Sequence, residues 1–456
     1  MTLTCFKSYD VRGRLGAELN PDIARAIGRA FAQVMTPVTV VVGYDARETS
    51  PTLKQALAEG LTQGGVDVID IGLCGTEEVY FATAHLEAGG GIMVTASHNP
   101  IDYNGMKLVG PGSRPVDPAT ELAQIRDLAG TGDFAQAEAL GTVTSQNTRT
   151  AYAAHVASMV RAKALCGVHV LANPGNGTAG AAFDAICSVL QDGGAELTVS
   201  KLHFEPDARF PNGIPNPLLP ENRGMTAAAL KEVGADIGLA WDGDFDRCFF
   251  FDETGAFLDG EYVVALLAQA VLVSEPGAHI VHDPRVIWAT TDAVAAHGGK
   301  AVAAKTGHAF MKAVMRQNDA AYGGEMSAHH YFRDFFFCDS GMIPWLKLVE
   351  RCVVTGQPLS AMVADLQARF PSSGEINFTV TDPKAVVERA VGHWASEAQS
   401  IDRLDGASFD FGDWRMNLRA SNTEPLLRLN LEARGDAVDL DAKLVQVRKV
   451  ITQVLA

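Results

Sequence analysis

The stretch GIMVTASHNP, residues 91–100, decides how the chain can be organised. Its apolar start follows glycines and leads into a polar loop with a proline, which is typical of a buried strand that ends in a loop. In open α/β sheets, ligands bind beside the loops that follow the carboxyl ends of strands. The stretch therefore predicts that the hydroxyl of Ser97, with the imidazole of His98 beside it, lies at the functional edge of a sheet.

A Ser-His pair alone does not define a catalytic site, because most such pairs are ordinary loop residues. The Gly-x-Ser-x-Gly elbow of hydrolases is absent, since Thr95 and Asn99 occupy its glycine positions. An amine follows at Lys107. Whether this loop is catalytic depends on its partners elsewhere in the chain.

The strand-then-helix pattern around this stretch occurs three times, which predicts related α/β units with largely parallel sheets. Each unit ends in a strand and a polar loop. The first ends at Ser97; the second leads from residues 237–241 into 242–247; the third leads from 320–322 into 323–330. We read the polar stretch at residues 6–13 as a loop before a helix at 21–35.

After residue 374 the pattern changes to alternating strands, at 376–380, 408–411, 414–420 and 426–433, with helices at 382–398 and at the end of the chain. This predicts a C-terminal α+β domain with an antiparallel sheet. We expect a central cleft shared by four domains, whose predicted limits are 1–146, 147–256, 257–370 and 371–456.

Composition limits the function classes. The chain has 456 residues and a net charge of −17, which argues against a general nucleic-acid or anionic-membrane binder. Its seven cysteines form no Cys-x-x-Cys motif, so we expect free thiols in a reducing compartment. No signal peptide is evident, and the longest apolar run, 262–273, predicts a buried helix. We therefore expect a cytoplasmic protein that does not enter a membrane.

The acidic loop is the sharpest signal: Asp242, Asp244 and Asp246 alternate between two apolar strands and can converge on one cation. A calcium EF-hand is improbable, because Arg247 stands where its turn needs glycine and the flanks resemble strands. A dehalogenase-type phosphatase, which is built on Asp-x-Asp-x-Thr, also fits poorly, because Asp246 and Arg247 stand in the loop where that motif needs threonine. Mg²⁺, which prefers a few carboxylates plus phosphate oxygens, is favoured over a solvated acidic turn.

A second polar turn, RASNTEP at residues 419–425, joins the last two predicted strands. A guanidinium, two hydroxyls and an amide around a tight turn can bind an oxyanion, with backbone N–H groups adding to the site. Hairpin turns are often rich in serine, asparagine and threonine, so a plain polar hairpin fits equally well.

Together, the serine loop, the acidic loop, the GEMSAHH stretch at 324–330 and the 419–425 turn resemble the α-D-phosphohexomutase superfamily in type and order, along the whole chain. The resemblance implies that Ser97 carries a phosphoryl group and that Mg²⁺ joins it to the three aspartates. Catalytic residues implied or predicted are Ser97, His98, Lys107, Arg247 and His308, with Lys107 or His308 as general acid or base. Substrate-binding residues implied are Tyr9, Arg12, Arg285, Glu325, Ser327, His329, Arg419, Ser421, Asn422, Thr423 and Arg428.

Within the superfamily, Met326 makes the sequence most similar to the bacterial phosphomannomutase branch that feeds GDP-mannose synthesis. That branch interconverts mannose 1-phosphate and 6-phosphate through a bound 1,6-bisphosphate, with glucose or mannose 1,6-bisphosphate as activator. Arg285 stands where the family often has lysine. The alternatives are a phosphoglucomutase or dual-specificity enzyme and, from another class, a non-catalytic sugar-phosphate sensor. We expect a hexose phosphate as the partner and a monomer or homodimer.

Overall fold

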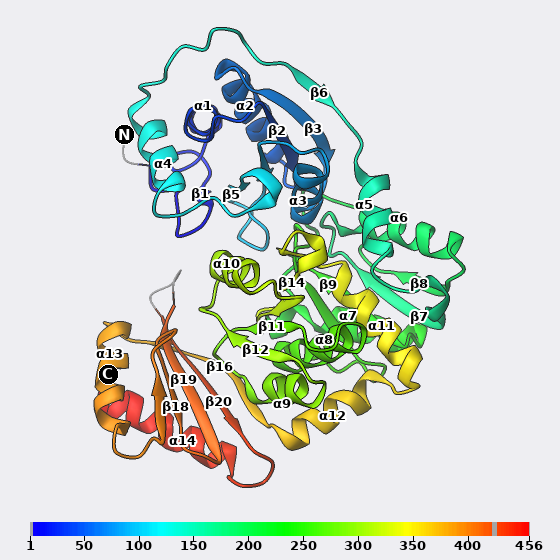
Figure 1. Cartoon of the computed structure of the whole chain (residues 1–456), viewed down its shortest axis with the longest axis vertical. Coiled ribbons are helices and arrows are strands. Elements are labelled where there is room, and N and C mark those ends of the chain that lie inside the picture. Colours follow the sequence, from blue (N-terminus) through cyan, green and yellow to red (C-terminus); the bar gives the residue numbers. More distant parts are fainter. Residues whose placement is uncertain (1–2, 422–425, 456) are drawn as a thin grey trace. The chain divides into compact units, whose positions relative to one another are not determined.

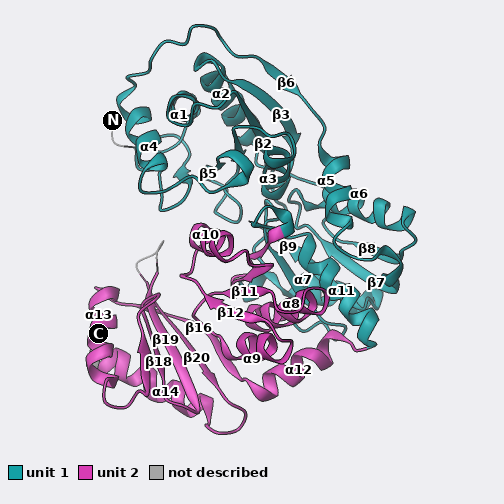
Figure 2. Ribbon diagram, in the orientation of Figure 1, with its two compact units in different colours: residues 1–257, 334–356 teal, residues 258–333, 357–456 magenta. Residues whose placement is uncertain are grey.

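The structure is a computed structural model that describes residues 3–421 and 426–455. Its contacts divide the chain into two compact units (Figure 2): unit 1 comprises Met1–Phe257 and Asp334–Gly356, and unit 2 comprises Leu258–Arg333 and Gln357–Ala456. Residues from 334 to 356 thus belong with the amino-terminal part of the chain, although the segment before them belongs to unit 2.

A mixed sheet begins unit 1, with strand order β1-β5-β4-β2-β3-β6 (Figure 1). The strands β4, β2, β3 and β6 are parallel, whereas β5 is antiparallel to both β1 and β4. Helix α1 starts where the Asn20 side chain accepts a hydrogen bond from the N–H of Ile23, and it buries Ile27 and Phe31 in the core. The elements are β1 (Val11–Arg14), α1 (Pro21–Met35), β2 (Thr39–Tyr44), α2 (Ser50–Gln63), β3 (Asp67–Leu73), α3 (Thr76–His85), β4 (Gly90–Val94), β5 (Tyr103–Val109), α4 (Glu121–Thr131) and β6 (Val143–Ser145).

The stretch at 6–13 was predicted as a loop, and this prediction is wrong for its last residues. Val11–Arg14 forms β1, and Val11 pairs with Met106 on β5. A polar, glycine-containing segment has little strand signal of its own, so its conformation comes from pairing with a strand about ninety residues away in sequence.

A second mixed sheet in unit 1 has the order β10-β9-β7-β8. The strands β9, β7 and β8 are parallel, and β10 returns antiparallel to β9. The ring of Phe183 on α6 packs on Trp241 at the end of β9 and on Trp345 in α11, with centroids 5.6 and 5.1 Å apart. The elements are α5 (Arg149–Ala157), β7 (Cys166–Asn173), α6 (Ala179–Asp192), β8 (Glu196–Lys201), α7 (Gly224–Val233), β9 (Ile237–Trp241), β10 (Cys248–Phe251), β15 (Cys338–Asp339) and α11 (Ile343–Thr355).

Unit 2 contains a sheet with β12-β11-β13-β14 as neighbours, in which β14 is antiparallel to β13 and the others are parallel. The strand predicted at 320–322 lies at Tyr322–Gly324 instead. Gly323 and Gly324 pair with Tyr331 and His330, so the polar loop begins only at Glu325. The elements are α8 (Gly260–Ser274), β11 (His279–His282), α9 (Trp288–Ala296), β12 (Lys300–Ala303), α10 (His308–Asn318), β13 (Tyr322–Gly324), β14 (His330–Phe332) and α12 (Leu359–Arg369).

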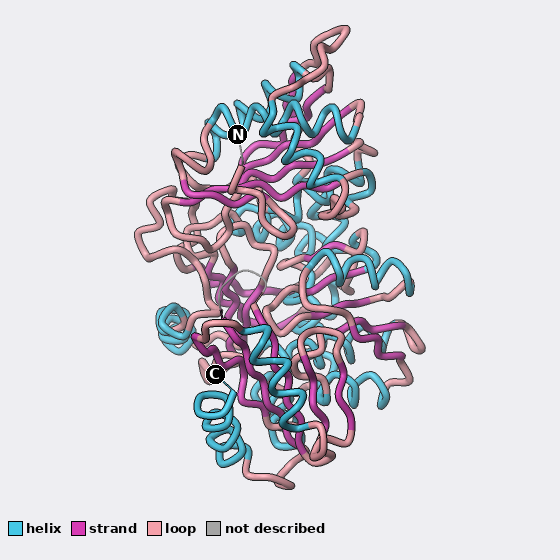
Figure 3. The backbone as a smooth tube through the Cα atoms, turned by 90° about the vertical axis from the view of Figure 1, so that its left-hand side faces the viewer, coloured by secondary structure: helices cyan, strands magenta, loops and turns pink. Residues whose placement is uncertain are grey.

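The last sheet of unit 2 is antiparallel throughout, with order β16-β20-β19-β18-β17. Leu427, Leu429 and Leu431 on β20 pack against α13 and the C-terminal helix, which lie against one face of the sheet (Figures 1 and 3). The elements are β16 (Ser372–Thr379), α13 (Pro383–Trp394), β17 (Ser400–Asp402), β18 (Ala407–Asp410), β19 (Trp414–Ala420), β20 (Leu426–Ala433), α14 (Leu440–Val450) and a π-helical end (Ile451–Leu455).

Most of the polar face of β20 is buried as well. Glu432 and Asn430 have no exposed surface. The carboxylate of Glu432 accepts the N–H groups of Ile287 and Trp288 and pairs with Arg415. The alternation of leucine and polar residues along β20 therefore separates two packed faces of the strand, not a buried face and a solvent-exposed one.

The predicted fold class, α/β with mixed sheets and a C-terminal antiparallel sheet domain, is confirmed. The shared central cleft stays a prediction. None of the seven cysteines, which all lie within the described residues, forms a disulfide. Within residues 3–421 and 426–455, no helix combines the length and the apolar character that crossing a bilayer requires.

Candidate active site

Ser97 lies in a turn just beyond β4 and is only 4% exposed. Its φ of 48° is left-handed, a region that residues with a Cβ rarely occupy. Its hydroxyl donates to Oδ2 of Asp242 at 2.6 Å, and Oγ lies 2.9 Å from Nδ1 of His98. The structure thus brings the predicted serine into contact with the first aspartate of the acidic loop, 145 residues away in sequence.

The acidic loop connects the antiparallel strands β9 and β10, so Asp242, Asp244 and Asp246 project from one tight turn. All three are buried, and ligand atoms from each lie within 4.8 Å of one another. Oδ1 of Asp244 and Oδ1 of Asp246 are buried without a hydrogen-bond partner. Buried carboxylate oxygens are normally satisfied, so this donor set fits a divalent cation such as Mg²⁺.

Two cations neutralise part of this acidic cluster. Nζ of Lys107, on β5, donates to Oδ2 of Asp244 at 2.7 Å and also to Asp246. Arg247 donates to Oδ2 of Asp242 through Nε at 3.0 Å and Nη2 at 2.8 Å. Burial opposes the charge of Lys107, but Asp244 and Asp246 outweigh burial and raise the pKa of this lysine, which stays protonated.

The carboxylates respond differently to their surroundings. Burial opposes ionisation of Asp242, but Arg247, His98 and Lys107 together outweigh burial and hold the pKa of Asp242 well below its usual range. Burial instead raises the pKa of Asp246, and Lys107 offsets this only in part. Two cations therefore do not fully support three ionised carboxylates, and a bound divalent cation would favour ionisation of all three.

His98 and Arg12 complete the surroundings of the Ser97 turn. Arg247 donates to Nδ1 of His98, and burial together with this guanidinium lowers the pKa of His98 below its ordinary value. Arg12, on β1, donates to the carbonyl oxygen of Ala96 at 3.1 Å and to the side chain of Asn99. Tyr9 is half-buried just before β1. Apart from Tyr9, the predicted residues of unit 1 thus gather around one hydroxyl and one acidic cluster.

Thr76, the first residue of α3, was not predicted from the sequence. Its hydroxyl donates to Oδ2 of Asp244 at 2.6 Å, and its N–H donates to the carbonyl oxygen of Asp244 at 3.0 Å. A threonine at a helix start is common in any protein, so the sequence contains no signal for this contact with a loop 168 residues away.

In unit 2, the loop after β13 holds the predicted sugar-binding residues. Glu325 is 2% exposed; its carboxylate accepts the N–H of Gly307 at 2.9 Å and the hydroxyl of Tyr331 at 2.6 Å. Burial raises the pKa of Glu325, and Arg285 opposes this. Ser327 lies in the same loop, with Oγ 3.3 Å from Nδ1 of His329. Tyr331, which was not predicted as a site residue, therefore orients Glu325.

His308 is the first residue of α10 and follows the Gly307 that binds Glu325. Its role as general acid or base stays a prediction.

The predicted phosphate-binding arginines of unit 2 also gather, around a residue that was not predicted. Glu375 on β16 pairs with Arg285 at 3.5 Å, Arg419 at 3.2 Å and Arg428 at 3.1 Å. Arg419 and Arg428 lie opposite each other on β19 and β20. Ser421 follows β19, whereas Asn422 and Thr423 lie outside the described residues.

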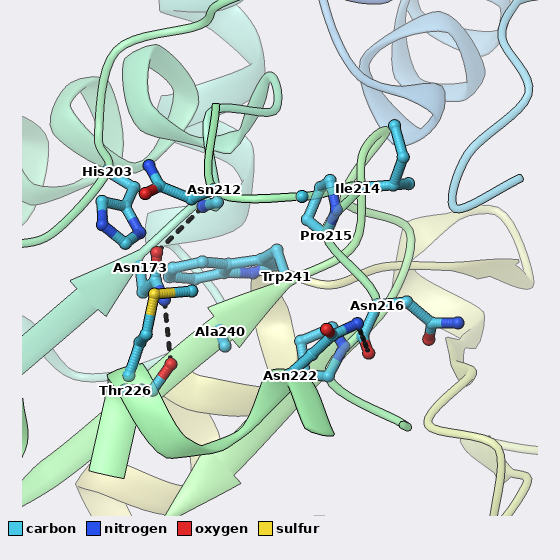
Figure 4. Close-up of a pocket in the computed structure, with 14 residues that line it drawn as sticks. Asn173, His203, Asn212, Ile214, Pro215, Asn216, Asn222, Thr226, Ala240 and Trp241 are labelled. Atoms are coloured by element: carbon cyan, nitrogen blue, oxygen red, sulfur yellow. Dashed lines mark hydrogen bonds between the residues drawn. The ribbon is translucent and has the colours of Figure 1, made fainter. Parts of the chain in front are cut away.

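A pocket at the Trp241 end of β9 in unit 1 is lined by four asparagine side chains together with apolar residues (Figure 4). Asn173 donates to Thr226 at 2.8 Å, and Asn222 donates to the carbonyl oxygen of Asn216 at 3.0 Å. Its cavity of about 30 Å³ has room for a few water molecules at most. The pocket is too small for a sugar phosphate and belongs to the polar packing of the unit.

Comparison with known proteins identifies the family. Four domain models of the phosphoglucomutase/phosphomannomutase family match in order: α/β/α domain I at residues 4–136, domain II at 150–255, domain III at 259–370 and the C-terminal domain at 375–450. A phosphomannomutase of Salmonella montevideo is 54% identical over 451 residues, covering 98% of this chain and 99% of that protein. A Xanthomonas campestris protein described as phosphohexose mutases is 52% identical, covering 99% of this chain and 100% of its own length.

The solved structures agree. A phosphoglucomutase/phosphomannomutase family protein from Burkholderia thailandensis superposes with a TM-score of 0.87 at 30% identity, covering 100% of this chain and 99% of that one. The domain order, the full-length identity and the fold all point the same way, and the chain therefore belongs to the phosphoglucomutase/phosphomannomutase family.

Proposed function

We propose that this chain is a phosphomannomutase that interconverts D-mannose 1-phosphate and D-mannose 6-phosphate through a phosphoserine at Ser97. The observation that carries the proposal is the contact of the Ser97 hydroxyl with Asp242, beside carboxylate oxygens that have no hydrogen-bond partner. Relatives described as phosphomannomutases that are 54% identical over nearly the whole chain support the choice of substrate.

In the proposed reaction, a sugar hydroxyl attacks the phosphorus on Ser97. The P–O bond to the sugar forms, the bond to Oγ of Ser97 breaks, the sugar hydroxyl proton passes to a base, and Oγ takes up a proton. The resulting 1,6-bisphosphate turns over in the site, and its other phosphate returns to Ser97. Positioning and charge stabilisation are the main demands of such a transfer.

The charges around Ser97 suit a phosphoserine, which carries about −1.5 to −2 charge at neutral pH. Arg247 and Arg12 supply positive charge at the turn. Mg²⁺, when bound by Asp242, Asp244, Asp246 and the Ser97 phosphate, would neutralise the remaining negative charge. Lys107 is protonated and suits the role of acid better than that of base, which leaves His308 as the base.

The residues of unit 2 would hold the sugar phosphate in either orientation. Glu325, Ser327 and His329 would bind the 3- and 4-hydroxyls, which are nearly symmetric between the two orientations. Arg285, Arg419, Arg428 and the 421–423 turn would grip the phosphate that is not transferring, because guanidinium groups bind phosphate oxygens in pairs. We further propose that a 1,6-bisphosphate activates the enzyme and that the enzyme works in the cytoplasm as a monomer or homodimer.

A dual-specificity phosphohexomutase is the second candidate, because the Xanthomonas relative is described as phosphohexose mutases. A coupled assay with mannose 1-phosphate and glucose 1-phosphate, each with catalytic glucose 1,6-bisphosphate, separates the two. If the chain is a phosphomannomutase, kcat/KM should be clearly higher for mannose 1-phosphate than for glucose 1-phosphate. Equal values would favour dual specificity, and binding of either sugar without turnover would favour a sensor.

A further inference from the structure

Arg47 is a buried residue that contacts the backbone of the Ser97 turn. It has no role in the proposed reaction and was not predicted from the sequence. It follows β2 by three residues, and its side chain is 1% exposed. Nη2 donates to the carbonyl oxygens of Ser97 at 2.9 Å and of Asn99, and Nη1 donates to those of Pro100 at 2.9 Å and Tyr103 at 3.1 Å. One guanidinium therefore binds four carbonyl oxygens of a single loop.

The bonds of Arg47 act on a backbone that needs support. Ser97 has a left-handed φ of 48°, a conformation that persists in a residue with a Cβ only where the surroundings hold it. The carbonyl oxygen of Ser97 also packs against the acidic loop, since a Cβ placed on Gly243 would lie 2.6 Å from it. The Ser97 carbonyl is thus held by Arg47 and lies against the loop that carries Asp242.

Arg47 is itself fixed in place. The buried carboxylate of Asp45 accepts the backbone N–H of Arg47 at 3.0 Å and lies 3.6 Å from its Nε. Asp45 also accepts the hydroxyl of Ser50 at 2.5 Å. Because Asp45 neutralises the guanidinium, the contribution of Arg47 is geometric rather than a charge offered to a phosphate.

We propose that Arg47 is a positioning residue for phosphoryl transfer: it holds the 97–103 loop so that Oγ of Ser97 faces Asp242 and the cation site. This inference rests on the proposed function for its kinetic consequence. Lysine cannot replace Arg47, because a single ammonium lacks the planar fork that reaches four carbonyl oxygens. A displacement of about 1 Å at a reacting atom can cost about 100-fold in rate.

The test compares Arg47→Lys with Arg223→Lys. Arg223 is a matched control in the same unit: it donates to the carbonyl oxygens of Pro217 and Leu218 and lies over the ring of Phe257, just as Arg47 lies over Phe210. The full chain is incubated with glucose 1,6-bisphosphate and Mg²⁺, and phosphorylation of Ser97 is followed by mass spectrometry. Hydrogen–deuterium exchange of the 97–103 amides is measured without any sugar phosphate.

Arg47→Lys should remain folded, take up the phosphoryl group about 100-fold more slowly than the wild type, and exchange the 97–103 amides faster. Its KM for sugar phosphate should change little, because substrate contacts lie elsewhere. Arg223→Lys should match the wild type in both measurements. Guanidinium ion, below denaturing concentrations, should partly restore phosphorylation to Arg47→Ala, which a general loss of stability would not explain.

Wild-type phosphorylation in folded Arg47→Lys, or unchanged exchange of the 97–103 amides, would overturn the proposal. If neither Arg47 variant folds, Asp45→Asn decides: it keeps Arg47 but weakens its support, and a wild-type phosphorylation rate there also overturns the proposal. If the wild type itself takes up no phosphoryl group, the proposed function fails, whereas the exchange measurement still decides the role of Arg47.

Discussion

Removing the hydroxyl of Thr76 should weaken binding of the divalent cation without altering the residues that contact it. Thr76→Val keeps the shape of the side chain and the backbone bond from residue 76 to the carbonyl oxygen of Asp244. It deletes only the 2.6 Å hydrogen bond to Oδ2 of Asp244. That bond and the one from Nζ of Lys107 to the same oxygen fix the rotation of the carboxylate, so that its unpartnered Oδ1 is the atom left for the cation.

The size of the effect follows from the bond. A hydrogen bond to a charged group contributes about 1.5–3 kcal/mol, and loss of such a partner behind a metal ligand costs about 10–100-fold in metal affinity. Calorimetric titration of the unphosphorylated protein with Mg²⁺ measures this directly. Activity should recover at saturating Mg²⁺, because the aspartates remain in place.

Thr83→Val is the matched control. Thr83 lies on the same helix, α3, is equally buried, and donates its hydroxyl to the carbonyl oxygen of Val79 at 2.7 Å. The two variants make the same chemical change, so a difference in Mg²⁺ affinity isolates the contact with Asp244. If Thr76→Val bound Mg²⁺ as tightly as Thr83→Val and the wild type, Thr76 would have no part in holding the cation.

Three further predictions concern charge. Burial lowers the pKa of His330 to about 3, whereas the unfolded chain binds this proton below about pH 6.5, so the free energy of unfolding decreases as the pH falls below that value. In urea unfolding, His330→Gln should remove about 2 kcal/mol of the decrease between about pH 7 and pH 5. An unchanged pH profile would contradict this. Lys107→Met leaves the acidic cluster without its ammonium, so Mg²⁺ should raise the melting temperature more in the variant than in the wild type; an equal shift would disprove it. Glu375→Gln removes the carboxylate shared by three arginines, so calorimetry should show that inorganic phosphate binds several-fold more tightly. The surface control Glu388→Gln should leave phosphate binding unchanged. Weaker phosphate binding in Glu375→Gln would refute the reasoning.

Local sequence patterns were enough to predict most of the fold. Strands such as Ile237–Trp241 and helices such as Pro21–Met35 have strong apolar periodicity and clear ends, so their positions agree with the prediction. Val11–Arg14 was missed because its strand conformation depends on pairing with β5. The buried polar face of β20 was not foreseen, because alternation shows that two faces differ but not what covers them.

The candidate site shows the same division. Ser97 and the aspartates stand out because hydroxyl and carboxylate groups follow apolar strands, and the structure brings them into contact. The residues that hold them do not stand out: Arg47 contacts carbonyl oxygens about fifty residues away, and Thr76 contacts a loop 168 residues away. Such contacts depend on tertiary packing, which a single sequence does not specify.

The most direct test of the account is the mass of the intact protein and of its Ser97 peptide after incubation with glucose 1,6-bisphosphate and Mg²⁺. The account predicts one added phosphoryl group, located on Ser97, that is lost when mannose 1-phosphate or 6-phosphate is added and that never forms in Ser97→Ala. A phosphoryl group on another residue, or full mutase activity in Ser97→Ala, would contradict it.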